Sequence, residues 1–121
     1  MLINLSNHPF AYWGGEQRRS ALAAWGDVED MAFPTIDPAA SREQLMPIVD
    51  ECFSRCCAVA TEYGAATAFH IMGESVFCYH IVARLLAAGY RVVASTTTRN
   101  TEYLPDGRKI ATFDFVNFRD Y

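Results

Sequence analysis

The sequence lacks several motifs that mark common chemistries, and each absence excludes a class of function. No G-x-G-x-x-G follows the first apolar segment, and no G-x-x-x-x-G-K-[ST] loop is present, which argues against the usual modes of binding dinucleotides and ATP. A G-x-S-x-G nucleophile elbow is also absent. The three histidines do not form H-E-x-x-H or any zinc-binding pattern. We therefore expect no tightly bound metal and no cofactor.

Charge, hydropathy and cysteine usage exclude further classes. The net charge of −4 argues against non-specific binding to long nucleic acid, which needs a basic surface. No apolar run approaches the roughly 20 residues of a membrane span, and residues 1–5 lack the basic flank of a signal peptide. The protein is therefore expected to be cytoplasmic, with no membrane partner. In that compartment the four cysteines, none in a C-x-x-C pair, are expected to be reduced and packed in the core.

Apolar segments of strand and helix periodicity alternate along the chain, which favours an α/β domain spanning residues 1–121. Ser41 and Gln44 form a capping-box pattern at the start of the second helix. The prediction is a Rossmann-like three-layer sandwich with a mostly parallel sheet of order about 2-1-3-4 and a C-terminal β-hairpin at the sheet edge. The expected elements are strands at residues 1–5, 28–33, 65–72 and 90–94, helices at 16–25, 41–63 and 74–88, and a hairpin pairing 101–104 with 109–118.

Polar loops are expected at the carboxyl ends of three strands, at residues 6–9, 73–75 and 95–99. In open α/β sheets, ligands bind outside these strand ends. Hydroxyls and backbone N–H groups donate to phosphate oxygens, arginine adds a bidentate donor, and glycine permits close approach of a ligand. The sequence therefore predicts a pocket for an anionic, nucleotide-like ligand. Its candidate contacts are Ser6, Asn7, His8, Gly73, Ser75, Ser95, Thr96, Thr97, Thr98 and Arg99.

Several side chains near this pocket have two interpretations. His8 can shuttle a proton near neutral pH or act as a simple loop donor. Glu74 can occupy the first helical turn because the helix dipole favours it there, or it can contact a sugar hydroxyl or act as a base. Phe10, Tyr12 and Trp13 can stack on a base, or they can pack in the core or at an interface. His70, inside a strand, is predicted to be a buried, hydrogen-bonded core residue.

Segments 4–9, 70–74 and 93–99, with the hairpin at 104–107 and the ending at 115–121, together resemble small stand-alone CRISPR-associated proteins with a CARF-like domain. The resemblance implies a homodimer that binds cyclic oligoadenylate, with cyclic tetraadenylate the expected ring, across its two-fold axis. Loops after the first and fourth strands supply the contacts in such domains. The residues that match these two loops are Ser6, Asn7 and His8 in the first, and Ser95, Thr96 and Arg99 in the second.

Some small members of this class are ring nucleases, which cleave the cyclic messenger and switch off type III antiviral signalling. The implied reaction needs no metal: a ribose 2′-OH attacks its adjacent phosphodiester and leaves a 2′,3′-cyclic phosphate. Arg99, Thr96 and Thr97 would hold the phosphate, and His8 would protonate the leaving 5′-oxygen or assist the attack. Unlike many ring nucleases of this class, the chain has no lysine near the expected site.

Three other functions remain open at the level of sequence. One is a module that senses or sequesters a nucleotide without cleaving it. Another is a nucleoside- or sugar-processing transferase with Glu74 as nucleophile. The last is a structural or regulatory subunit with no ligand. Every ligand-binding hypothesis requires that the turn at residues 6–9 and the threonine-rich segment at 95–99 meet at the same edge of the sheet.

Overall fold

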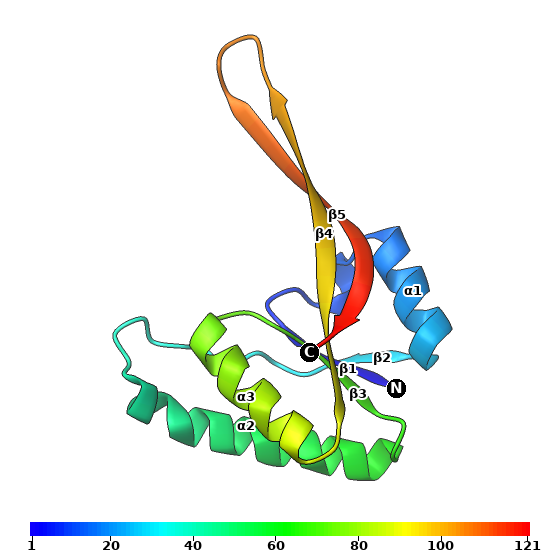
Figure 1. Cartoon of the computed structure of the whole chain (residues 1–121), viewed down its shortest axis with the longest axis vertical. Helices are drawn as coiled ribbons and strands as arrows, with labels where there is room; N and C mark the ends of the chain where they lie inside the picture. Colours follow the sequence, from blue (N-terminus) through cyan, green and yellow to red (C-terminus); the bar gives the residue numbers. More distant parts are fainter.

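The fold is built on one five-stranded sheet of order β2-β1-β3-β4-β5, seen in the computed structural model of residues 1–121 (Figure 1). Strands β1 (Leu2–Ser6), β2 (Val28–Asp30) and β3 (Ala68–Met72) are parallel. Strand β4 (Arg91–Tyr103) runs parallel to β3, and β5 (Lys109–Asp120) runs antiparallel to β4. The predicted α/β class with a mostly parallel sheet is confirmed. The predicted order of about 2-1-3-4 continues with β5. This strand is a full fifth member of the sheet and not part of a separate hairpin added to its edge.

Helices cover both faces of this sheet because its strands alternate two sets of apolar side chains. Helices α2 (Arg42–Tyr63) and α3 (Ser75–Ala87) lie together on one side of the strands in Figure 1, and α1 (Gly15–Trp25) lies on the other. None of these helices is both long and apolar enough to cross a bilayer.

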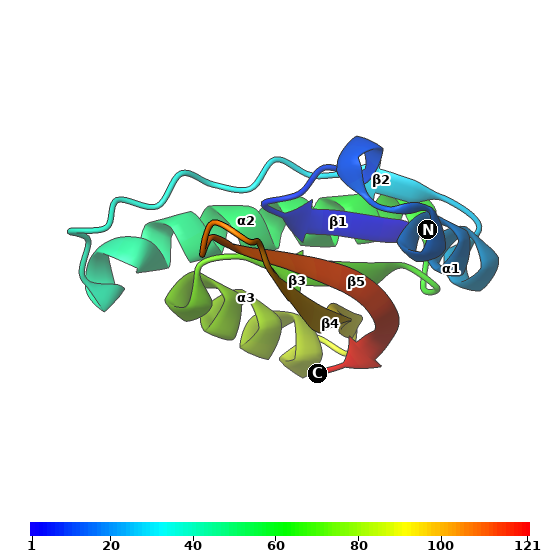
Figure 2. The ribbon, with the colours of Figure 1, turned by 90° about the horizontal axis from the view of Figure 1, so that it is seen from above.

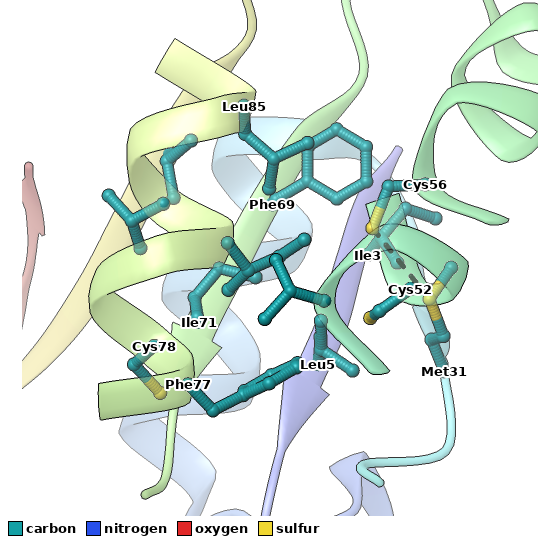
Figure 3. Close-up of a cluster of buried hydrophobic side chains, with 14 of the residues drawn as sticks. Ile3, Leu5, Met31, Cys52, Cys56, Phe69, Ile71, Phe77, Cys78 and Leu85 are labelled. Atoms are coloured by element: carbon teal, nitrogen blue, oxygen red, sulfur yellow. Dashed lines mark hydrogen bonds between the residues drawn. The ribbon is translucent and has the colours of Figure 1, made fainter. Parts of the chain in front are cut away.

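The larger core packs β1 and β3 against α2 and α3. Its residues from β1 and β3 are Ile3, Leu5, Phe69 and Ile71, which are at most 1% exposed (Figure 3). Helix α2 begins at the predicted capping box, in which Ser41 Oγ accepts from Gln44 N at 3.2 Å and Gln44 Oε1 accepts from Ser41 N at 2.8 Å. It then buries one apolar stripe against the strands. The buried members of this stripe are Leu45, Val49, Cys52, Cys56 and Ala60.

The smaller core lies on the opposite face of the sheet, beneath α1. It contains Leu2, Trp13, Ala21, Ala68 and Val93, all buried. Strand residues alternate between faces, so the residues two positions further along β1, β3 and β4 continue this same face toward the carboxyl ends of the strands. Those residues are polar: Asn4 in β1, His70 in β3 and Ser95 in β4. Ser6, two positions beyond Asn4, is polar as well. The α1 face therefore changes from apolar to polar along the strands.

The segment expected as a loop at residues 95–99 is instead part of β4, so this prediction is wrong. Beyond residue 96, β4 and β5 pair only with each other, and in Figure 1 they rise away from the rest of the molecule as a two-stranded arm, defined here as residues 97–115. Figure 2 views the same arm from above. The arm is stabilised by backbone pairing and not by burial. Because its side chains are not buried, the threonine-rich segment needs no apolar run. The turn predicted around residues 105–107 is confirmed, with Gly107 at φ +86°.

A β-bulge separates the arm from the body of the sheet. Thr96 pairs with Asn117, but Thr97 pairs with Phe115, so Val116 is an extra residue in β5. Because of this extra residue, three phenylalanines of β5 face the same side as alternate residues of β4. Their cross-strand pairs are Ser95 with Phe118, Thr97 with Phe115 and Arg99 with Phe113.

Candidate functional site

A cavity of about 550 Å³ lies at the carboxyl ends of β1 and β3, where the arm leaves the sheet, and is called here the site cavity. Six of the ten predicted ligand contacts line it: Ser6, Asn7, His8, Gly73, Ser95 and Thr97. The structure therefore brings the turn after β1 and the threonine-rich segment to one place. Tyr12 and Trp13 also line it, and the sequence left base stacking and core packing open for both. The remaining lining residues were not predicted to contact a ligand: Gly14, Gln17, His70, Met72 and Phe113.

Strand geometry explains which predicted residues do not line the site cavity. Side chains alternate along β4, so Thr96 and Thr98 face away from Ser95 and Thr97. Thr96 Oγ1 instead bonds to Asn117 across the bulge, accepting from its N–H at 3.1 Å. Arg99 lies further out, with its guanidinium carbon 5.9 Å from the centre of the Phe113 ring.

Ser75 lines a different surface groove along α3, which also includes Tyr79, Leu86 and Tyr121. Its neighbour Glu74 caps the α3 N-terminus: its carboxylate accepts from Val76 N at 3.2 Å and from Phe77 N at 2.6 Å. The helix-start interpretation of Glu74 therefore accounts for its position, and its side chain does not line the site cavity. The capped N-terminus also has fewer free N–H groups to offer an anion.

Gly73 is required by packing. A Cβ atom at this position would lie 2.4 Å from Cζ of Phe33, so the phenyl ring occupies the space that a side chain would need. Close approach of Phe33 is thus one reason for this glycine, and close approach of a ligand stays a prediction because Gly73 also lines the site cavity.

The N-terminus of α1 opens onto the site cavity. Its N-cap, Gly14, has no side chain to bond the first N–H groups, and both Gly14 and Gln17 line the cavity. An uncapped helix N-terminus carries a partial positive charge that favours anions. The signal for this contribution was the Gly14-Gly15 pair, which forms the N-cap and the first residue of the helix.

The turn after β1 is held by the backbone carbonyl of His8. That oxygen accepts hydrogen bonds from Asn4 Nδ2 at 2.9 Å, Trp13 Nε1 at 2.9 Å and Ser6 Oγ at 3.1 Å. The second Asn4 amide proton is donated to Asp30 Oδ1 at 2.8 Å. The backbone of His8 is therefore fixed, while its imidazole is exposed at the cavity wall.

His70 is 2% exposed and hydrogen-bonded at both ring nitrogens, which confirms the prediction of a buried, bonded histidine. Its Nδ1 lies 2.9 Å from Asn4 Oδ1, and its Nε2 lies 3.2 Å from Ser95 Oγ. Burial lowers the pKa of His70 from 6.5 to about 4, so the ring is neutral at physiological pH. Sequence reasoning missed that this core residue also reaches the cavity.

Aromatic side chains border the site cavity with different exposure. Trp13 is buried and packs edge-on against His70, with ring centres 5.1 Å apart, so core packing accounts for it. Tyr12 and Phe113 line the cavity and are 82% and 63% exposed. These two rings are therefore free to meet a planar group.

No three side chains of the His, Cys, Asp and Glu types come together in an arrangement that could hold a metal ion. Comparison with known proteins finds no match among curated proteins or solved structures. A model of the family described as "Uncharacterized protein MJ1673 family" matches residues 1–119 of the 121, and the chain therefore belongs to the MJ1673 family.

Proposed function

We propose that the protein is a CARF-like, Rossmann-like CRISPR-associated protein that binds cyclic oligoadenylate in the site cavity. We further propose that it cleaves this ligand as a metal-independent ring nuclease and so switches off type III antiviral signalling. The observation that carries the proposal is the meeting of the turn after β1 with Ser95 and Thr97 of β4 around one cavity. These were the two segments on which the hypothesis depended.

The chemistry of the cavity wall suits a nucleotide. The hydroxyl of Thr97 can donate to a phosphate oxygen, and the uncapped α1 N-terminus adds positive potential. The exposed rings of Tyr12 and Phe113 offer flat surfaces for adenine stacking. A volume of about 550 Å³ is that of a typical small-molecule site and is too small for a ring of four nucleotides. Cyclic tetraadenylate would therefore lie across two such cavities in a two-fold homodimer.

In the proposed reaction, a ribose 2′-OH attacks its own phosphodiester in line. Ser95 and Thr97 would hold the phosphate, and Arg99 would reach it from the arm. His8, whose imidazole is exposed at the cavity wall, would protonate the leaving 5′-oxygen. Glu74 takes no part, because its carboxylate caps α3.

The test is incubation with cyclic tetraadenylate in EDTA, followed by mass spectrometry of the products. We expect linear products that end in a 2′,3′-cyclic phosphate. His8→Ala should slow cleavage about 100-fold, since general acid catalysis contributes roughly that much. Thr97→Ala should weaken binding about fivefold to tenfold through one lost hydrogen bond, while Thr98→Ala, on the opposite face of β4, serves as the matched control.

Two results would count against the proposal in different ways. Intact ligand after long incubation with excess protein defeats the nuclease, and undetectable binding defeats the whole proposal. Tight binding without turnover would instead favour the second candidate, a module that senses or sequesters the messenger. One observation favours that candidate: no lysine or arginine lines the cavity, so little positive charge is in place to stabilise the transition state.

A further inference from the structure

Three polar side chains from three different strands form a continuous hydrogen-bonded series that ends at the site cavity. Asn4 of β1 contacts His70 of β3, and His70 contacts Ser95 of β4. Asn4 is 1% exposed and His70 is 2% exposed, while Ser95 is half-buried and lines the cavity. The series therefore connects a buried base to a hydroxyl that a ligand can reach.

The partners of Asn4 determine which nitrogen of His70 carries the proton. The Asn4 amide nitrogen faces two acceptors, the His8 carbonyl and the Asp30 carboxylate, so its Oδ1 must point toward His70. An amide oxygen only accepts hydrogen bonds, so Nδ1 of His70 must donate. Because the neutral imidazole has a single N–H, Nε2 holds a lone pair that faces the Ser95 hydroxyl at 3.2 Å.

The hydroxyl proton of Ser95 has only one strong acceptor nearby. Ser95 Oγ contacts Nε2 of His70 and the thioether sulfur of Met72, the latter at 2.8 Å. Thioether sulfur is a weak acceptor, and imidazole nitrogen is a strong one. The O–H bond of Ser95 is therefore directed at His70, as in a nucleophile–base pair held by a third, orienting group.

The surroundings of Ser95 also provide a donor for developing negative charge. The backbone N–H of Ser95 is directed at the Met72 sulfur at 3.3 Å, which is a poor partner for it. Met72 is 36% exposed, so its side chain can move aside and free this N–H for an oxyanion.

We propose that Ser95 is a nucleophile, with His70 as its general base and Asn4 as the residue that positions the imidazole, and that the site cavity reacts covalently with phosphorus esters. Ser95 Oγ forms a bond to phosphorus while its proton passes to Nε2 of His70. The P–O bond to the leaving group breaks, and the leaving alkoxide takes the proton back from His70. Water then attacks the phosphoseryl group with His70 again as base, and Ser95 Oγ leaves and recovers its proton.

This inference does not depend on cyclic oligoadenylate being the ligand. In the reaction of the preceding section the nucleophile is a 2′-OH of the substrate, whereas here it belongs to the protein. A probe without any nucleotide therefore separates the two, and either proposal can fail alone.

The experiment treats the whole protein with diisopropyl fluorophosphate at neutral pH. Ser95 Oγ bonds to phosphorus, fluoride leaves, and His70 accepts the serine proton. Intact-mass and peptide mass spectrometry should show one diisopropylphosphoryl group per chain, on Ser95. Ser95→Ala should carry no such group, and His70→Gln should react about 100-fold more slowly, as expected when a general base is removed. Thr98→Ala, on the opposite face of β4, should react at the wild-type rate.

A second measurement on the wild type does not depend on a folded His70 variant. Nitrogen NMR of the imidazole should show a protonated Nδ1 and an unprotonated Nε2, and Ser95→Ala should shift the Nε2 resonance. The proposal is overturned if Ser95 is not labelled in the wild type, if folded His70→Gln reacts at the wild-type rate, or if Nε2 carries the proton.

Discussion

The two halves of β4 are maintained by different forces. Near its start, β4 lies between β3 and β5, and Val92 and Val93 are at most 1% exposed. From residue 97 onward the strand has β5 as its only neighbour, and every residue is exposed. The first half is stabilised by burial of apolar side chains and the second by backbone pairing, which makes an isolated two-stranded ribbon only marginally stable. One strand can thus be rigid core at one end and a locally opening arm at the other.

The site cavity lies at the junction of these two halves. Its wall includes His70 from the buried body and Phe113 from the arm. Substitutions in the body and in the arm should therefore affect different parts of the cavity wall. Single substitutions in each half can test whether the two halves are stabilised differently.

The largest expected effect comes from truncating an aromatic ring in the body. Phe69→Ala removes a fully buried ring and should lower the free energy of unfolding by about 3–5 kcal/mol. Phe113→Ala, in the arm, removes a ring that is 63% exposed and should change it by less than about 0.5 kcal/mol. Urea denaturation of both variants measures the difference. Equal losses would mean that the arm is as much a part of the core as β3.

Low pH should lower the free energy of unfolding of the body through His70. The unfolded state binds a proton below the ordinary pKa of 6.5, whereas burial holds the native pKa near 4. Between these values the unfolded state binds more protons, so stability is lost as the pH falls, by about 3 kcal/mol between pH 7 and pH 4.

The control for this effect is His70→Gln, which cannot titrate. The free energies of unfolding of wild type and variant, measured by urea denaturation at both pH values, should converge toward pH 4. Parallel curves would show that His70 contributes nothing to acid sensitivity.

The smallest expected effect is confined to the tip of the arm. Gly107 has φ +86°, so Gly107→Ala should favour opening of the arm by about 1 kcal/mol. Amide hydrogen exchange in the arm should then accelerate about fivefold while exchange at Val92 and Val93 stays unchanged. Gly107→Asn, which tolerates this backbone region better, should show a smaller acceleration. A uniform acceleration would show that the two halves open together.

The body of the fold could be predicted because burial leaves a periodic trace in the sequence. Short apolar runs marked β1 and β3, and the Ser41–Gln44 box marked the start of α2. The arm left no such trace, because its polar residues are held by pairing with β5. The phenylalanines of β5 did alternate, but the extra residue Val116 interrupted the pattern before Phe118.

The sequence predicted where the candidate site lies better than it predicted which residues form it. The topology of parallel strands indicated which edge would hold it, and Ser6, His8 and Ser95 are found there. The contact between Asn4 and His70 could not be predicted, because these residues are 66 positions apart and strand register alone brings them together. Glu74 had two physically sound interpretations, and only the coordinates of its carboxylate separated them.

Val116 has a consequence for how this arm can evolve. The pairs on either side of it, Thr96 with Asn117 and Thr97 with Phe115, would already be in register if Val116 were deleted. Bulges bend a strand and increase its twist, so losing this single codon would straighten the ribbon and change where it points. Every cross-strand partner would be kept. A deletion of Val116 could therefore change the direction of the arm without changing which side chains lie on each of its faces.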